Sequence, residues 1–378
     1  MKLFKSLLVA PATLGLLAPM TATANELNLK DVSGYSSSEE VQNISEFNPA
    51  EELAVTNSRV DGLEARLNNF EAGSFSETTT ASFSVDTVIG AVDGAGDSGD
   101  TSLESTSFDF QFNIGLSTSF TGEDSLDIAI DNGSATASTM GGKMGFDTGT
   151  ALTVDGVTYS FPVGGATMVV GDATDISTTF TGACVYSSFT DYTPDDCGTK
   201  NSLGIGGADV TATIGYAFDN GFSLAGGISS PETEILGDAA DVYGLNAAYS
   251  ADNYGVALAY VTNDGGAAAE TTTWGFNGYY TFDLASLSVG YETQETGGTD
   301  SDGYFVGLTF PEVGAGSVNV AAATTGLVAE GADEKMIYEA SYSYPVNDAM
   351  TITPGIFIQE NDGTDDETGI AVKTSFSF

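Results

Sequence analysis

The stretch "SFDFQFNIGLSTSF" alternates apolar and polar side chains with a period of two. Its apolar positions are Phe108, Phe110, Phe112, Ile114, Leu116 and Phe120. Its polar positions are Asp109, Gln111, Asn113, Ser117 and Ser119. Because successive side chains of a β-strand point to opposite faces, this pattern predicts a strand with one apolar and one polar face.

Segments of the same kind recur at intervals of about twenty residues, in pairs joined by short turns. "VTATIGYAF" and "FSLAGGI", for example, flank Asp219-Asn220-Gly221, and Asn-Gly is a strong hairpin signal. The pairs are separated by longer acidic connections: "SSPETEILGDAAD", "TNDGGAAAET", "ETQETGGTDSD" and "ENDGTDDET". The sequence therefore predicts sixteen strands in which short turns alternate strictly with long loops.

This repetition favours a closed barrel over a soluble sandwich, whose strands also alternate. A bilayer tolerates strands only in a closed sheet, because an open edge leaves backbone groups unpaired in hydrocarbon. The predicted lipid-facing rows carry essentially no charge, and aromatic residues gather near the strand ends, where interfacial girdles belong. The predicted fold class is all-β, a transmembrane antiparallel β-barrel of about 16 strands over residues 75–378.

The N-terminus predicts export. Two lysines precede an apolar run over residues 7–20, and Ala22-Thr23-Ala24 is a small-x-small cleavage site. Residues 1–24 are therefore predicted to be a signal peptide. A membrane anchor is the alternative, but the run is short and two prolines interrupt it. After residue 24 no stretch approaches the roughly 20 apolar residues of a membrane helix.

A short helix is predicted before the barrel. Residues 25–50 are polar and aperiodic, whereas residues 51–74 carry apolar positions at spacings of three and four. The principal members of this heptad pattern are Leu53, Val60, Leu63, Leu67 and Phe70. Such a short helix is marginal alone, so the pattern predicts a periplasmic coiled coil that self-associates. Packing of the helix on its own chain is the alternative.

The composition excludes several function classes. The chain has 53 acidic and 9 basic residues, and no histidine. Nucleic-acid binding needs Lys and Arg, so nucleic acid is not an expected partner. The missing histidine removes the common nucleophile–base pairs and zinc motifs, so the chain is not expected to be an enzyme. Paired carboxylates remain, but so many acids make such pairs easy to find by chance.

Two features concern cysteine and metal chemistry. Cys184 and Cys197 are the only cysteines, and in an exported chain an even count predicts one disulfide; two free thiols are the alternative. The acidic stretches 93–100 and 361–367 contain oxygen ligands for Ca²⁺ or Mg²⁺ but lack EF-hand spacing. They are interpreted as solvated loops, so no cofactor is expected.

Several stretches resemble the major outer-membrane porins of cyanobacteria, within the OprB-type carbohydrate-selective porin family. They are the leader "MKLFKSLLVAPATLGLLAP", "VQNISEFNP", "SRVDGLEARLNNFEAGSFSETTTASF", "VTYSFPVG", "YEASYSYPVNDAMTITPGIFI" and the final Phe378. The resemblance implies a homotrimer in the outer-membrane lipid with a periplasmic N-terminal segment. The S-layer-homology motifs of that family are missing from residues 25–74, so cell-wall binding is not carried over.

The resemblance also suggests where the passage lies. The third external loop, residues 173–202, is the longest, and in porins this loop commonly folds inward. We expect it to form the constriction, stiffened by the disulfide; a stapled surface loop is the alternative. Its candidate pore residues are Asp175, Asp191, Asp195, Asp196, Tyr186 and Tyr192. On the alternation argument, the expected lumen-facing residues of the wall are Asp109, Glu339, Lys335 and Lys373.

The expected function is passive diffusion of inorganic ions and small hydrophilic solutes. No arginine follows Arg66, and acids far outnumber lysines in the barrel region, so cation preference is expected. Two alternatives stay open: carbohydrate-selective uptake, and a plugged structural barrel that links envelope layers. The terminal Phe378, with apolar residues at every second position before it, resembles the signal read by the outer-membrane insertion machinery.

Overall fold

The computed structural model describes residue 59 and residues 79–94, 105–136, 139–205, 209–237, 240–266, 268–361 and 365–378. The predicted signal peptide, the polar segment 25–50 and the coiled-coil positions Leu53, Val60, Leu63, Leu67 and Phe70 lie outside these residues. In this part of the chain only Arg59 is described, and it is helical and exposed. No helix among the described residues is long and apolar enough to cross a membrane.

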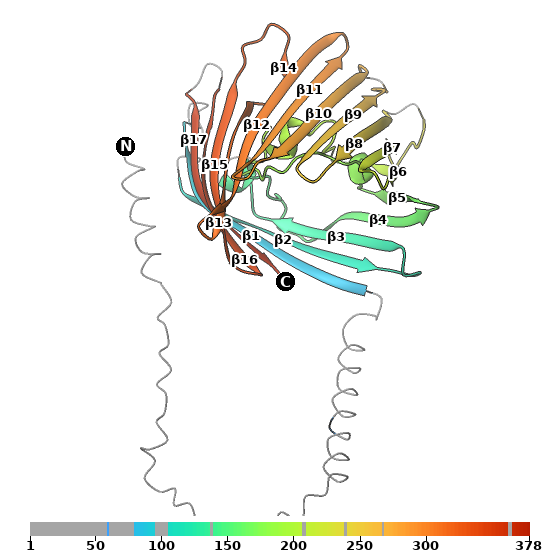
Figure 1. Ribbon diagram of the computed structural model, residues 1–378, viewed down its shortest axis with the longest axis horizontal. Helices are drawn as coiled ribbons and strands as arrows, with labels where there is room; N and C mark the ends of the chain where they lie inside the picture. The colour runs from blue at the N-terminus through green and yellow to red at the C-terminus, as the bar shows by residue number, and fades with distance from the viewer. Residues whose placement is uncertain are drawn as a thin grey trace, which may run out of the picture. The chain divides into compact units, whose positions relative to one another are not determined.

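The described residues form a closed antiparallel barrel, drawn in Figure 1. Its strands are β1 (Thr79–Asp93), β2 (Ser107–Thr118), β3 (Ser125–Gly133), β4 (Thr153–Val163), β5 (Ala166–Asp172), β6 (Val210–Ala217), β7 (Phe222–Ser230), β8 (Val242–Ser250), β9 (Tyr254–Asn263), β10 (Thr271–Thr281), β11 (Ser286–Thr296), β12 (Thr299–Val313), β13 (Gly316–Thr324), β15 (Met336–Asn347), β16 (Met350–Gln359) and β17 (Glu367–Ser377). The two-residue strand β14 (Val328–Ala329) only adds to β12, while β13 pairs directly with β15. The wall therefore has sixteen strands, and the predicted fold class is confirmed.

The connections distinguish the two ends of the barrel. At the turn end, connections as short as Gly164-Gly165 join β4 to β5. At the loop end, the connections are mostly longer, and the longest is 173–209. One predicted loop is wrong: "ETQETGGTDSD" extends β11 and β12, which meet at Gly297-Gly298. Both glycines have positive φ, as a two-residue hairpin turn requires, so here acidic composition hid a strand pair.

The alternation places most large apolar side chains outside and mostly small or polar ones inside, apart from the apolar wall residues that the β3–β4 and β5–β6 connections cover. On β10, Trp274 and Phe276 point outward and are 47% and 41% exposed. Asn277 points inward and is buried. The adjacent strands keep the same register, so Gly290 of β11 faces the lumen opposite Asn277. The outer surface is thus suited to hydrocarbon and the inner surface to polar contacts.

Aromatic rings gather on the outside near the turn end. Phe222 contacts Tyr249 with ring centroids 4.6 Å apart, and Tyr280 contacts Phe282 at 4.7 Å. Their amphipathic or apolar rings occupy the level at which an interfacial girdle belongs.

The C-terminal residue completes the closure of the barrel. The Phe378 amide donates to the Phe83 carbonyl at 3.0 Å, and the Phe83 amide donates to the Phe378 carbonyl at 2.9 Å. Their rings stack with centroids 5.8 Å apart. The last residue of the chain is therefore part of the β1–β17 junction.

The β2–β3 turn is organised by the buried carboxylate of Asp124. Its Oδ1 accepts from the amides of Phe120 and Thr121 at 2.9 and 2.8 Å, and its Oδ2 accepts from the Tyr159 hydroxyl at 2.7 Å. The Tyr159 hydroxyl, followed by the Thr121 amide, holds the pKa of Asp124 far below its usual range. The ionised carboxylate therefore stabilises this turn.

This turn gives a pH-dependent prediction. Asp124→Asn should lower the thermal unfolding temperature at pH 7, because Asn lacks the charge and one acceptor. Because the pKa of Asp124 is lower in the folded protein than in the unfolded chain, where it is about 3.9, its ionised form stabilises the fold above about pH 4. This stabilisation is lost as the pH falls from there toward the folded-state pKa. The difference from wild type should therefore persist down to about pH 4 and shrink below it. Circular-dichroism melting checks this, with exposed Glu123→Gln as control; a pH-independent difference would contradict the assignment.

Candidate functional site

The described residues of the longest connection, 173–205 and 209, lie inside the barrel (Figure 1). We call it L3, since it is the third connection at the loop end. It contains two short 3₁₀ turns, η4 (Ile176–Thr179) and η5 (Asp195–Gly198). Backbone amides taken out of water need partners. In L3 several of these partners are inward-facing side chains of the barrel wall.

Two asparagines of the wall hold the first half of L3. The Thr181 amide donates to Asn246 Oδ1 of β8 at 2.8 Å, and Asn246 Nδ2 donates back to the Thr181 carbonyl at 3.3 Å. The Ala183 amide donates to Asn277 Oδ1 of β10 at 2.7 Å. Both asparagines are buried, so these bonds fix the path of L3 across two strands.

Glu339 of β15 is the strongest anchor of L3. Its carboxylate accepts four hydrogen bonds: from the Tyr186 hydroxyl at 2.9 Å, the Phe189 amide at 2.8 Å, the Thr190 amide at 3.0 Å and the Thr190 hydroxyl at 2.6 Å. Only 4% of Glu339 is exposed. Burial, followed by the nearby Glu339 carboxylate, raises the pKa of Tyr186 well above its usual range, so its hydroxyl stays a donor.

Glu292 of β11 anchors the second half of L3. Its Oε2 accepts from Asn201 Nδ2 at 2.8 Å, and its Oε1 accepts from the Ser202 hydroxyl at 2.5 Å. Sequence reasoning missed this residue, because it assigned "ETQET" to a loop. Extending the alternation by one residue pair past Gly290 would have placed Glu292 on the inner face.

Inward-facing glycines let L3 lie directly on the wall. A Cβ on Gly290 would stand 1.6 Å from the Cys197 carbonyl oxygen. A Cβ on Gly355 of β16 would stand 2.6 Å from the Phe189 ring. Larger residues at these positions would therefore push L3 away from the strands.

Cys184 and Cys197 are joined by a disulfide within L3, with their Cα atoms 5.9 Å apart. Cys197 is completely buried in a cluster with Tyr186, Phe305 and Ile337. The disulfide thus lies between the loop and the wall of β12 and β15, within an apolar contact.

The described residues of a second connection, 134–136 and 139–152, also lie against the inner wall; we call this connection L2. Its helix α4 (Met140–Lys143) begins next to Asp109 of β2. The Oδ2 atom of Asp109 accepts a hydrogen bond from the Gly141 amide at 3.0 Å. The Asp191 amide of L3 donates to the Lys143 carbonyl at 3.1 Å. L2 and L3 are therefore bonded to each other as well as to the wall.

Lys143 ties three parts of the chain together. Its Nζ forms an ion pair with Glu367 of β17 and lies 5.8 Å from the centre of the Tyr192 ring of L3. Burial lowers the pKa of Lys143, but its interactions with Glu367 and Tyr192 together outweigh burial, so the net pKa is raised. This lysine is therefore charged and engaged with its neighbours.

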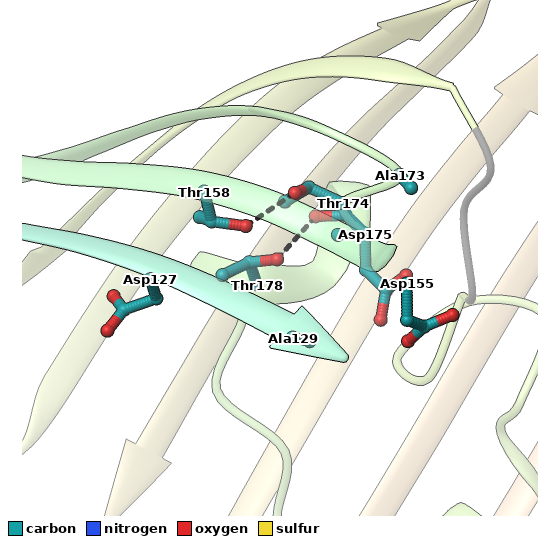
Figure 2. A pocket seen from close by; sticks show the side chains of 9 residues that line it. Asp127, Ala129, Asp155, Thr158, Ala173, Thr174, Asp175 and Thr178 are labelled. Atoms are coloured by element: carbon teal, nitrogen blue, oxygen red, sulfur yellow. Dashed lines mark hydrogen bonds between the residues drawn. The ribbon is translucent and has the colours of Figure 1, made fainter. Parts of the chain in front are cut away.

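Beside L3 are two neighbouring cavities next to the wall of β3 to β7. Figure 2 shows the first, with a volume of about 410 Å³. Its lining includes Asp127 of β3, Asp155 of β4 and Asp175 of L3, together with Thr158 and Thr178. The second, about 350 Å³, is lined largely by hydroxyl-bearing and small residues. Among the described residues, neither lining contains Lys or Arg.

The negative charge near the first cavity changes the pKa of Asp147 of L2. Burial, followed by the neighbouring carboxylates of Asp131 and Asp155, raises the pKa of Asp147. Its Oδ2 is buried and makes no hydrogen bond in the described part of the chain. This region therefore carries excess negative potential. No group of three or more metal-ligating side chains with suitable geometry occurs among the described residues.

The predicted site residues divide into different environments. Asp175 lines the first cavity. Asp191 pairs with Lys200 at 2.9 Å, and Asp195 accepts from the Ser188 hydroxyl at 2.9 Å. Asp196 has a left-handed backbone in η5.

The remaining predicted residues lie against the wall or beyond it. Tyr186 and Tyr192 belong to the apolar contact between L3 and the wall. Asp109 accepts a hydrogen bond from L2, and Glu339 accepts hydrogen bonds from L3. Lys373 of β17 faces inward, 6.0 Å from the centre of the Phe146 ring. Lys335 lies in the connection 325–335, one residue before β15.

Neither a family model nor a curated relative matches the sequence. Solved structures do match. Pseudomonas putida OprB is 12% identical, with a TM-score of 0.63 over 80% of this chain and 94% of that one. Vibrio cholerae OmpT without its loop L8 is 11% identical, with a TM-score of 0.58 over 80% and 99%. A Rh. blastica porin mutant is 17% identical, with a TM-score of 0.52 over 79% and 100%.

The chain has the porin fold. At these identities the likeness extends to the architecture of the barrel and not to its individual side chains.

The anchoring of L3 gives a prediction for Glu339→Gln. The amide has one acceptor oxygen, and its NH₂ group would face the donors that the second carboxylate oxygen now satisfies. Each buried donor left unpaired costs about 1–3 kcal/mol, so the middle of L3 should loosen. Limited proteolysis with mass spectrometry should show faster cleavage near Phe189 than in wild type. The exposed Glu312→Gln serves as control; equal cleavage of both variants would contradict the anchor role.

Proposed function

We propose that the chain is a passive diffusion porin of the outer membrane, with L3 as its constriction and a preference for cations. The observation that carries this proposal is the lining of the two cavities beside L3, which contains carboxylates and hydroxyls and, among the described residues, no Lys or Arg. Carboxylates near low-dielectric walls raise the local concentration of cations. Inorganic cations and small neutral hydrophilic solutes fit such a lining best.

The lysines of the barrel region support the same proposal. Lys143 is neutralised by Glu367, and Lys200 by Asp191. Lys373 lies over the Phe146 ring, away from the two cavities' linings. In the part of the chain that the structure describes, the linings of the two cavities therefore contain no Lys or Arg that would attract anions.

Membrane insertion is part of the proposal. The exposed apolar belt suits a bilayer, and the predicted signal peptide suits export to the outer membrane. The terminal Phe378, placed at the barrel junction, suits an insertion signal read by the assembly machinery. The resemblance of the sequence to cyanobacterial porins extends the proposal to a homotrimer.

The two alternatives draw unequal support. A carbohydrate channel would need several aromatic faces along the passage. Tyr186 and Phe189 of L3 are buried against the wall, and Tyr216 is the one aromatic residue among the described residues that line the two cavities. A plugged structural barrel is favoured by the apolar contacts that L2 and L3 make inside the barrel. Conductance separates it from the porin.

Planar-bilayer recording under a tenfold KCl gradient tests the proposal. We expect ohmic conductance and a reversal potential of cation-selective sign, below the roughly 59 mV limit of ideal selectivity. A reversal potential near zero would contradict the cation preference. Insertion without any conductance would contradict the porin function and favour the plugged barrel.

A further inference from the structure

We infer that L2 and L3 together close one side of the lumen, so that solutes pass along the β3–β7 side, where Asp127 and Asp155 of the wall and Asp175 of L3 set ion selectivity. This inference rests on the proposed function and deepens it. It assigns selectivity to Asp127, to Asp175 and to Asp155, the last of which the alternation pattern does not single out, and it removes other lumenal carboxylates from that role.

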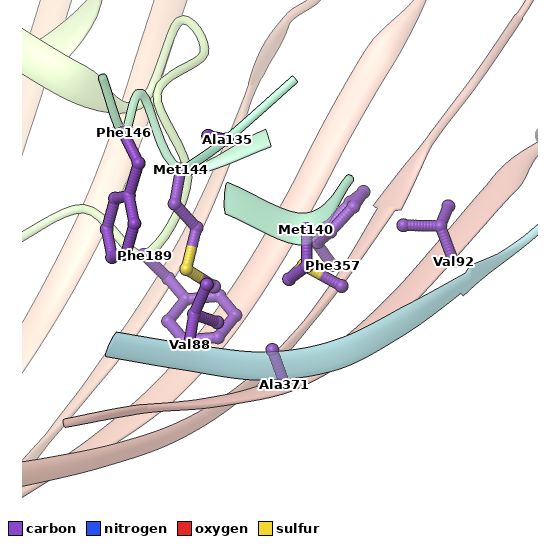
Figure 3. Packing of buried hydrophobic residues seen from close by; sticks show 9 residues of the cluster. All are labelled: Val88, Val92, Ala135, Met140, Met144, Phe146, Phe189, Phe357 and Ala371. Atoms are coloured by element: carbon purple, nitrogen blue, oxygen red, sulfur yellow. The ribbon is translucent and has the colours of Figure 1, made fainter. Parts of the chain in front are cut away.

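The closed side is filled by an apolar cluster inside the barrel (Figure 3). L2 contributes Met140, Met144 and Phe146, and L3 contributes Phe189. The wall contributes Val88 and Val92 of β1, Phe357 of β16 and Ala371 of β17. Val88 and Phe357 point inward and yet are 0% exposed. Residues that line a water-filled channel would be wetted, so this side of the lumen is closed.

Polar contacts between L2, L3 and the wall also hold this side of the lumen closed. Lys143 of L2 pairs with Glu367 of β17, and its carbonyl accepts from the Asp191 amide of L3. Asp109 of β2 binds the first turn of α4. L2, L3 and the strands β1, β2 and β17 are therefore held as one unit around the apolar cluster. Opening this side would expose both apolar surface and an unpaired charge.

The open side is continuous in the lining of the two cavities. The first cavity is bounded by β3, β4 and the start of L3, and the second by β4 to β7 and the same part of L3. Thr178 of η4 contributes to both. Ser160, Thr167 and Ser223 supply hydroxyls along the wall of the second. Such a surface is wettable, and among the described residues Tyr216 of β6 is the one aromatic side chain that lines it.

A bulge places Asp155 in the first cavity. The β3–β4 register shifts between Ala129 and Ile130, which leaves Asp155 as an extra residue of β4. Such a bulge can turn a side chain away from the regular alternation. Asp155 is exposed and lines the cavity together with Asp175 of the opposing loop (Figure 2).

Other carboxylates of the inner wall are already committed to the loops. Asp109, Glu292 and Glu339 are 3%, 1% and 4% exposed, and each accepts hydrogen bonds from L2 or L3. Their charges are satisfied by these donors and separated from the cavities. They therefore act on selectivity only by positioning the loops.

Substituted cysteines test which side conducts. The native cysteines are disulfide-bonded, so Thr158→Cys on the open side and Ala371→Cys on the closed side each add a single reactive thiol. With a cationic trimethylammonium methanethiosulfonate reagent, we expect complete labelling of Thr158→Cys, a smaller current and a lower cation preference. Ala371→Cys should remain unlabelled, with its current unchanged. Labelling of Ala371→Cys at the rate of Thr158→Cys would overturn the closed side.

Charge neutralisation tests the assigned selectivity residues. Asp155→Asn should lower the cation-to-anion permeability ratio at least about twofold, while exposed Glu312→Gln at the turn end should leave it unchanged. An unchanged ratio in an Asp127→Asn/Asp155→Asn double variant would overturn the assignment. Labelling is also read by mass, which does not require conduction. A failure of this inference is therefore distinguishable from a failure of the proposed function.

Discussion

The structure depends on how a long loop can lie inside a barrel without leaving its backbone unpaired. A buried amide without a partner costs about as much as a lost hydrogen bond, so L3 needs acceptors supplied by the wall. Glu339 satisfies the amides of Phe189 and Thr190, and Asn277 satisfies that of Ala183. These contacts are charge-assisted or amide-to-amide and are buried, which makes them both strong and specific in geometry. The position of L3, and with it the shape of the lumen, follows from them.

This arrangement gives the acids of one chain three different tasks. Asp124 organises a turn outside the lumen. Glu339 and Glu292 hold L3, and their low exposure removes them from contact with solutes. Asp155 and Asp175 line a cavity whose described lining contains no Lys or Arg. An acidic composition alone predicts an electronegative protein, but burial and hydrogen bonding decide which of the carboxylates meet a permeating ion.

Local sequence patterns were sufficient to predict the strands of the barrel wall, but they were insufficient to predict how the loops inside the lumen contact that wall. The period-two alternation predicted the strands, because side-chain direction in a strand is a local property. It also placed Asp109 and Glu339 on the inner face, but it could not assign their partners, since these lie 32 and about 150 residues away in sequence. The extension of β11 and β12 as far as the Gly297-Gly298 turn was missed because its acids resembled a loop. Asp155 was missed because a bulge interrupts the alternation that would have revealed it.

Hydrogen–deuterium exchange of the native barrel in detergent tests most directly whether the wall holds L3 inside. The account predicts that the amides of Ala183, Phe189 and Thr190 exchange as slowly as those of the neighbouring strands, because each donates to a buried wall side chain. Exchange of these amides at the rate of an exposed loop such as 231–237 would contradict it.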